Sequence, residues 1–198
     1  MILLILPNQL FAKHPGLTLD PSRVILLEDS LFFGDLQYPM QFHKQKLWLH
    51  RASMKRYESE LQDKGFKVQY VDYDAKKPTL ADQLQKSIRP KDRKANRLVC
   101  IDPTDFAIEK RLRKACDAMD VACEIIPNPG FLNCTEENQD YRAGKKRWFM
   151  ADFYKWQRRR MNILMDGDQP QGGQRKFGDL DWEAEAKPAR TCDTRYLQ

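Results

Sequence analysis

The sequence lacks the long apolar segments that membrane and secreted proteins need. No apolar run approaches the roughly 18 to 20 residues that a helix requires to cross a bilayer. The apolar start, residues 1–6, has no basic leader and ends at Pro7, so it is typical of a buried strand and not of a secretory signal. We therefore expect no association with a membrane.

Cysteine is scarce, and its spacing is irregular. The five cysteines form no C-x-x-C pair; they are Cys100, Cys116, Cys123, Cys134 and Cys192. This pattern argues against a zinc site and against a disulfide scaffold, so we expect no metal site. It fits reduced thiols in the cytoplasm.

Glycine-rich phosphate-binding motifs are also missing. No G-x-G-x-x-G follows the first apolar run, and no G-x-x-x-x-G-K-[ST] occurs anywhere in the chain. These absences exclude a dinucleotide site of the usual type and a P-loop NTPase. We expect any ligand to be bound by side chains instead of by a glycine-rich backbone turn.

The composition is that of a folded domain with a mildly basic surface. Hydrophobic residues make up 41% of the 198 residues, and aromatic residues make up 11%. The net charge of +6 arises from 34 Lys and Arg against 28 Asp and Glu. Because both signs are abundant, the excess indicates at most a weak contact with DNA.

Five short apolar runs predict strands, at residues 2–6, 24–27, 67–71, 98–101 and 122–126. The first two runs are continuous and not alternating, which is typical of strands covered on both faces. Amphipathic patterns predict helices at 44–64, 80–88 and 106–119, with Gly65 as a left-handed cap and Thr104 or Asp105 at the start of the third helix. This alternation predicts an α/β fold, a doubly wound, five-stranded and mainly parallel sheet of the Rossmann-like type.

The pattern changes after the fifth run. We expect a polar loop up to Gly144, then one long basic and aromatic helix at about 146–165. We place the end of the α/β domain near Met165. Residues 166–198 are interpreted as a linker followed by a disordered tail.

In a doubly wound sheet, ligands bind outside the carboxyl ends of the strands, where the strand order reverses. Asn8 and Gln9 follow the first predicted strand, Glu28 follows the second, and Asp102 and Asp105 follow the fourth. The amides can bond to the edge of a heterocycle. We predict that these five residues line a ligand site, although Asn8 as a helix cap and Gln9 as a solvated side chain are the structural alternatives.

The helix beginning near His43 is expected to point at the same edge. Lys44 and Lys46 lie at its N-terminus, where they oppose the helix dipole unless an anion lies nearby. His50 shares the inward stripe of this helix. These three residues are candidate ligand contacts; a tolerated surface pair of lysines and a core histidine are the alternatives.

The predicted 146–165 helix combines basic and aromatic residues. The basic ones are Lys145, Lys146, Arg147, Arg158, Arg159 and Arg160. Interleaved charges and rings are typical of proteins that bind single-stranded nucleic acid. Phe149, Phe153 and Trp156 nevertheless lie at helical spacing, so we favour a face that docks onto the sheet or onto another protein domain.

Five segments resemble one protein family, the photolyase-related proteins that include iron–sulfur bacterial cryptochromes and (6-4) photolyases. Residues 6–10 resemble the family's P-x-Q-L element, and residues 42–54 resemble its H-H-K-x-K…S-A-M-R-H helix. Residues 65–70 resemble G-x-x-V-x-Y. Residues 129–132 resemble x-x-F-L, and 149–173 resemble M-x-x-F-Y-R-x-x-R-x-x-x-x-L-M-x-x-x-x-P-x-G-G.

The resemblance implies a light-harvesting antenna domain. In that family the N-terminal domain holds a pigment, commonly 6,7-dimethyl-8-ribityllumazine, and the positions that match its site are Asn8, Gln9, Glu28, Lys44, Lys46 and His50. FAD and a [4Fe–4S] cluster belong to a helical catalytic domain for which this chain is too short, so the resemblance implies no photolyase activity of the chain alone. A partner could be that helical domain, docked on the 146–165 helix. The alternative is a pigment-free module that contacts nucleic acid or protein.

Two segments depart from the family pattern. Residues 174–179 read Q-R-K-F-G-D, where the family continues K-W-x-F-D-x-E-N-R. Residues 32–39 form a longer loop than is usual in the family. We expect that loop to lie over the ligand crevice.

Overall fold

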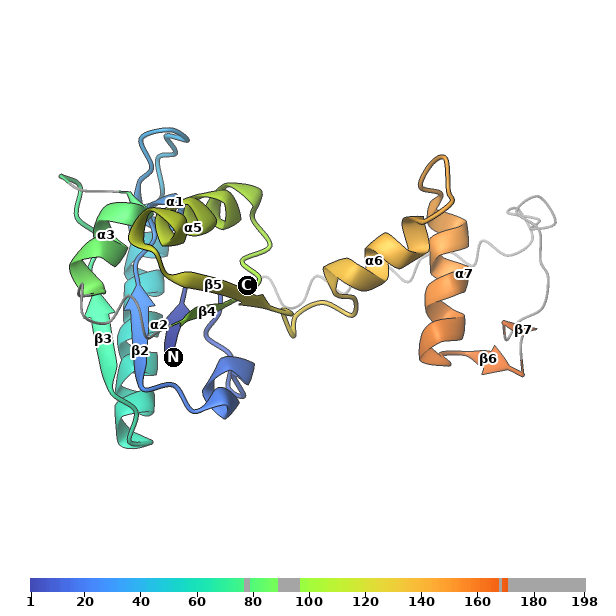
Figure 1. The fold of residues 1–198 in the computed structure, drawn as a ribbon, viewed down its shortest axis with the longest axis horizontal. Helices are drawn as coiled ribbons and strands as arrows, with labels where there is room; N and C mark the ends of the chain where they lie inside the picture. Colours follow the sequence, from blue (N-terminus) through green and yellow to red (C-terminus); the bar gives the residue numbers. More distant parts are fainter. Residues whose placement is uncertain (77–78, 89–96, 168, 171–198) are drawn as a thin grey trace, which may run out of the picture. The chain divides into compact units, whose positions relative to one another are not determined.

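The computed structural model describes residues 1–76, 79–88, 97–167 and 169–170, and its main feature is one parallel sheet (Figure 1). Five strands build this sheet: β1 (Ile2–Ile5), β2 (Arg23–Leu27), β3 (Val68–Val71), β4 (Arg97–Ile101) and β5 (Ala122–Ile126). Their order is β3-β2-β1-β4-β5, and every pair is parallel. The predicted doubly wound α/β fold is therefore confirmed, with a sheet that is wholly parallel.

The central position of β1 explains its unbroken apolar sequence. Leu4 pairs with Ile25 of β2 on one side and with Cys100 of β4 on the other. All four residues of β1 are buried, because helices or loops cover the sheet on both faces. Alternate residues of β1 point to opposite faces of the sheet and pack in different apolar clusters. Leu4 belongs to one cluster, and Leu3 and Ile5 belong to the other.

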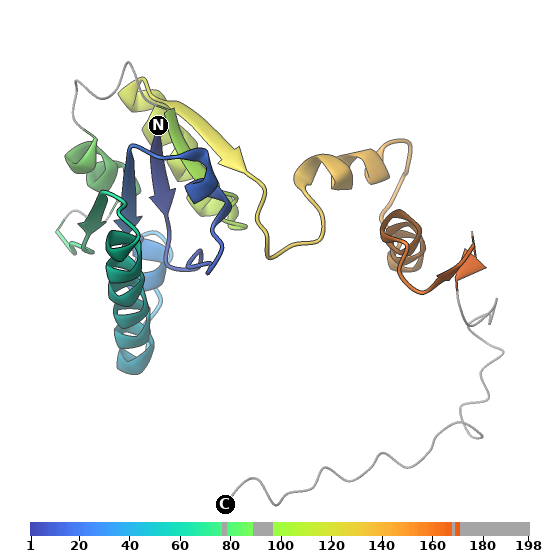
Figure 2. The same cartoon turned by 90° about the horizontal axis from the view of Figure 1, so that it is seen from below.

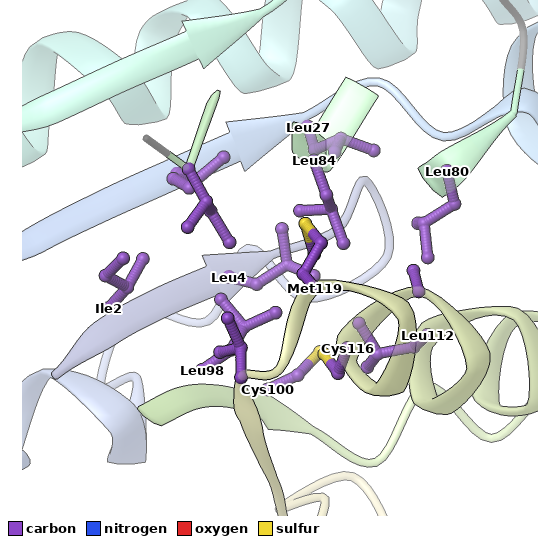
Figure 3. Close-up of a cluster of buried hydrophobic side chains, with 14 of the residues drawn as sticks. Ile2, Leu4, Leu27, Leu80, Leu84, Leu98, Cys100, Leu112, Cys116 and Met119 are labelled. Atoms are coloured by element: carbon purple, nitrogen blue, oxygen red, sulfur yellow. The ribbon is translucent and has the colours of Figure 1, made fainter. Parts of the chain in front are cut away.

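The helices divide between the two faces of the sheet, as the turned view in Figure 2 also shows. Helix α2 (Lys44–Asp63) buries Met54, Tyr57 and Leu61 on one face. The short 3-10 helix η1 (Pro15–Leu19) connects β1 to β2. Helices α3 (Leu80–Ser87) and α5 (Phe106–Met119) cover the opposite face, and Figure 3 shows their side chains meeting those of β1 and β4. Across the described ranges, no helix is both long enough and apolar enough to span a bilayer.

The predicted caps of these helices are present. Gly65 adopts a φ of 86°, the left-handed conformation expected after α2. Asp105 caps α5, and its Oδ1 accepts hydrogen bonds from the amides of Ala107 (2.8 Å) and Ile108 (3.1 Å). Of the two caps considered for this helix, Asp105 is the correct one.

The chain after β5 differs from the prediction. The segment predicted as a polar loop contains helix α6 (Thr135–Arg142), and α7 (Met150–Met161) is shorter at both ends than the predicted 146–165 helix. Asn162 ends α7 because it adopts a left-handed φ of 52°. The predicted linker holds two short antiparallel strands, β6 (Met165–Asp166) and β7 (Gln169–Pro170).

The chain divides into two compact units, Met1–Thr135 and Glu136–Gln198. This division falls well before the domain end that we expected near Met165. The first unit holds the whole parallel sheet, and the second holds α7 and the β6–β7 pair. The expected disordered tail, residues 174–198, lies outside the described residues.

Candidate functional site

The strand order reverses beside β1, so the carboxyl ends of β1 and β4 form the switch point of the sheet. Gln9 lies there and is completely buried. Its Oε1 accepts from the amide of Leu6 (3.2 Å), and its Nε2 donates to the carbonyl of Ile101 (2.8 Å). Gln9 therefore links the ends of β1 and β4, and these bonds occupy both ends of its amide group.

The other predicted residues at this edge are closer to solvent. Asn8 is exposed, and its Nδ2 donates to the carbonyl of Pro103 (3.4 Å). Asp102 is half-buried and accepts a bond from the amide of Thr104 (2.7 Å). Asp105 serves as the cap of α5. The structure thus brings these residues to the edge where they were predicted, but it gives each of them a hydrogen bond within the domain.

Glu28 is the most fully bonded of the predicted site residues. Its side chain has no exposed surface, and the two carboxylate oxygens accept from Arg51 Nε (2.7 Å) and Nη2 (2.5 Å). The hydroxyl of Tyr70 (2.7 Å) and the amide of Tyr73 (2.8 Å) donate to the same carboxylate. Burial by itself raises the pKa of Glu28, but the bonds from Arg51, Tyr73 and Tyr70 together lower that pKa below its ordinary value.

The cation that pairs with Glu28 is Arg51. Lys44 and Lys46 are exposed, and Lys46 Nζ lies 4.3 Å from the centre of the Phe42 ring. His50 is half-buried against the Phe32 ring (5.8 Å between centroids). Burial, together with the charge of Lys46, lowers the pKa of His50.

A second carboxylate cluster, which was not predicted, lies on the α5 side of the same edge. Helix α1 (Ser30–Phe33) follows β2 and leads into the long loop noted in the sequence. Asp35 in this loop accepts from Ser30 Oγ (2.6 Å) and forms two bonds with Arg111 (2.6 and 3.0 Å). The bonds from Arg111 hold the pKa of Asp35 well below its ordinary value.

Asp29 lies between these clusters in the sequence and has a different environment. Its side chain caps α1 by accepting from the amide of Leu31 (2.9 Å), while its Oδ2 is buried without a hydrogen-bond partner. Burial raises the pKa of Asp29 to about 6. The carboxyl group is thus a buried acid that titrates near neutral pH.

A pocket of about 340 Å³ lies beside Asp35 and Arg111. Three segments form its walls: the α1 loop, the start of α3, and one face of α5. The lining residues are Ser30, Asp35, Leu36, Gln37, Thr79, Leu80, Ala81, Arg111, Lys114, Ala115 and Ala118. None of the eight residues predicted for ligand binding is among them.

The sequence contains a signal for this pocket that we did not use. Lys114 and Ala115 lie three and four residues after Arg111, and Ala118 lies three residues after Ala115, so all four share one face of α5. Two alanines on such a face leave room beside the helix, and an arginine and a lysine border that room. The loop at 32–39 also contributes to the lining, through Asp35, Leu36 and Gln37.

The basic residues of the second unit have unequal surroundings. Arg160 pairs with Glu137, and Arg158 bonds to the carbonyls of Ile163 and Leu164. Lys145 lies over the ring of Tyr141 (4.5 Å). Lys146, Arg147 and Arg159 are exposed.

The aromatic residues of the second unit pack largely on one another. Tyr141 of α6 is buried against Phe153 (4.9 Å between centroids), Trp156 (5.0 Å) and Trp148 (5.5 Å). Phe149 remains 53% exposed. Part of the predicted docking stripe is therefore used within the unit, and both docking and nucleic-acid contact stay predictions.

No potential metal centre emerges from the described ranges, where no three His, Cys, Asp or Glu side chains gather closely enough to hold an ion. The fold and the pocket together define a doubly wound α/β domain with a pocket between the α1 loop, α3 and α5.

Comparison with known proteins identifies the family. The family model of deoxyribodipyrimidine photo-lyase-related proteins matches residues 3–181, and the chain belongs to this family. The chain is 32% identical over 183 residues to the uncharacterized protein R852 of Acanthamoeba polyphaga mimivirus, covering 89% of this chain and 90% of R852. It is 25% identical over 192 residues to a (6-4) photolyase of Agrobacterium fabrum, covering 94% of this chain but only 36% of that photolyase.

Proposed function

We propose that the first unit binds a planar heterocyclic antenna pigment, of the 6,7-dimethyl-8-ribityllumazine type, in the pocket beside Asp35 and Arg111. The observation that carries this proposal is the pocket itself. Its volume of about 340 Å³ falls near the lower end of the range, roughly 300 to 1,000 Å³, that small-molecule sites occupy. The family resemblance supplies the class of ligand, since photolyase-related proteins commonly hold such a pigment in this domain.

The residues of the pocket fit a flat ring with polar edges. Leu36, Leu80 and Ala81 supply apolar walls, and the α5 face with Ala115 and Ala118 leaves space for a ring. Burying the faces of a heterocycle against such walls is favourable because it removes apolar surface from water. These side chains would set the plane of the ring.

Polar groups at one end of the pocket are already oriented. Asp35 accepts two bonds from Arg111, whose Nη2 also donates to Gln37 Oε1 (3.1 Å). The guanidinium is therefore held before any ligand arrives, which lowers the entropy lost on binding. The Nε–H of Arg111, which none of these bonds uses, would donate to a ring carbonyl or nitrogen.

Lys114 adds positive charge to the lining. No hydrogen bond or ion pair of Lys114 is found within the described residues, and its side chain is exposed. A cation at this position would attract the polar substituent or an anionic edge of the pigment. The proposed role of the chain is to bind and orient the pigment; it involves no bond-breaking step.

The substitution Ala118→Trp tests the location of the site. Ala118 lines the pocket but is exposed on α5, so an indole there would fill the space without entering the core. We expect the dissociation constant for 6,7-dimethyl-8-ribityllumazine to rise more than about tenfold, which corresponds to about 1.4 kcal/mol of lost binding energy. Fluorescence titration measures this constant, and far-ultraviolet circular dichroism checks the fold.

Ala12→Trp is the matched control, because Ala12 is exposed and does not line the pocket. It adds the same indole elsewhere on the first unit and should leave the dissociation constant unchanged. If Ala118→Trp binds the lumazine as tightly as the wild type, the pigment does not occupy this pocket.

A further inference from the structure

Cys116 and Cys123 lie on two elements that are joined by a tight turn. Helix α5 ends at Met119, and Asp120 then adopts a left-handed φ of 55°. The amide of Val121 donates to the carbonyl of Cys116 (3.1 Å), which reverses the chain at once. Strand β5 therefore begins beside the last turns of α5.

The strand presents Cys123 to the helix. Cys123 packs against the apolar cluster that contains Cys116, whereas Ile126 of the same strand packs against the cluster on the other face. Figure 3 shows Cys116 reaching from α5 into this cluster. The two thiols lie close enough for each to shift the pKa of the other.

The two cysteines of this pair are not equivalent. Cys116 has no exposed surface, whereas Cys123 is only partly buried. The interaction with Cys116 lowers the pKa of the Cys123 thiol, and the nearby charge of Arg113 acts in the same direction. Burial of Cys123 and the carboxylates of Asp117 and Glu109 oppose this shift without reversing it.

A third cysteine in the same cluster, Cys100, has a different environment. Cys100 is completely buried, and its Sγ donates to the carbonyl of Ile101 (3.2 Å). Burial raises the pKa of this thiol. Since thiolates and not thiols react with oxidants, Cys100 should remain reduced where Cys123 is oxidised.

We propose that Cys123 and Cys116 form a peroxide-sensitive dithiol, in which Cys123 is oxidised first and Cys116 then closes a disulfide. In the first step the thiolate of Cys123 attacks a hydroperoxide, and the O–O bond breaks. One oxygen stays on sulfur as a sulfenic acid, and the other leaves, after taking a proton, as water or an alcohol. In the second step the sulfur of Cys116 attacks the sulfenic sulfur, and the hydroxyl leaves with the proton of Cys116 as water.

Peptide mapping of the full chain tests the disulfide. The reduced protein is treated with hydrogen peroxide, its remaining thiols are alkylated, and it is cleaved before aspartates. Cleavage before Asp117 and Asp120 separates Cys116 from Cys123, so a disulfide between them joins two peptides whose summed mass is lower by two hydrogens. Cys134 lies on the same peptide as Cys123, so a disulfide from either residue to Cys116 would join the same two peptides. The assay is therefore run on the Cys134→Ser variant.

The single variants distinguish the two roles. With Cys116→Ser, the sulfenic acid on Cys123 should persist and be trapped by dimedone, at a yield more than about tenfold above that at Cys100. With Cys123→Ser, Cys116 should show neither dimedone adduct nor cross-link. The proposal is overturned if the Cys134→Ser protein yields no joined peptides, or if Cys116 is labelled in Cys123→Ser as strongly as Cys123 is in Cys116→Ser.

Discussion

Replacing Glu28 by alanine is expected to lower the free energy of unfolding by about 2 to 4 kcal/mol. The variant leaves the hydroxyl of Tyr70 and the amide of Tyr73 without their acceptor, and it removes the partner of Arg51. This loss of unfolding free energy is smaller than for a fully buried ion pair, because the Arg51 side chain is 50% exposed and can be solvated. Urea unfolding followed by circular dichroism measures the loss.

Two further variants separate the contributions at this site. Glu28→Gln keeps an acceptor for Tyr73 and should cost less than Glu28→Ala. Arg51→Met removes only the half-exposed partner and should also cost less, although it leaves the buried carboxylate with fewer donors. An unchanged denaturation midpoint for Glu28→Ala would show that the carboxylate is not structural and would return it to the set of candidate ligand contacts.

Asp29→Asn is expected to stabilise the protein at pH 7.5, by about 1 to 3 kcal/mol. Burial raises the pKa of Asp29 to about 6 from its ordinary value of 3.8, so between these pH values the folded protein holds a proton that the unfolded chain releases. The stability due to this proton is present at low pH and is lost as the pH rises through about 6. Asparagine removes the ionisation and keeps an oxygen that can cap α1.

The measured quantity is the difference in unfolding free energy between Asp29→Asn and the wild type at pH 5 and at pH 7.5. We expect this difference to be larger at pH 7.5 by about 1 kcal/mol. Comparison with the wild type is needed because His14, whose pKa burial lowers to about 4, changes stability in the opposite sense over this range. An equal difference at both pH values would show that Asp29 ionises normally in the folded protein.

The parallel sheet could be predicted because its signals are local. Strands buried on both faces require continuous apolar residues, as in residues 2–6, and the crossover helices place theirs at steps of three and four. The caps at Gly65 and Asp105 follow from single residues whose conformational preferences are strong. These features depend on residues that are close together in the sequence, so they can be predicted without the tertiary structure.

The site was less predictable because its bonds join distant positions. The predicted residues do lie at the carboxyl edge of the sheet. Glu28, however, forms hydrogen bonds with Tyr70 and Arg51, which lie tens of residues away in the sequence. Such partners decide whether a polar side chain is free to bind a ligand. The sequence alone does not show that the bonds of Gln9 and Glu28 are already made within the domain.

The second unit was misjudged for a different physical reason. Helix α6 buries only Tyr141, so it lacks the apolar periodicity from which helices are recognised. Its first turn carries Glu136 and Glu137 and its last turn Arg142, charges that favour a helix through its dipole. The prediction extended α7 too far toward the C-terminus. The helical sequence pattern continues past Met161, but the left-handed conformation of Asn162 ends the helix there.

The most direct test of the proposed function is a titration of the wild-type chain with 6,7-dimethyl-8-ribityllumazine, followed by fluorescence and repeated with a deazaflavin. We expect saturable binding of one lumazine per chain, and the complex should keep its near-ultraviolet to blue absorbance after gel filtration. A chain that is folded by circular dichroism but binds neither pigment saturably would contradict the assignment of an antenna pigment to this domain.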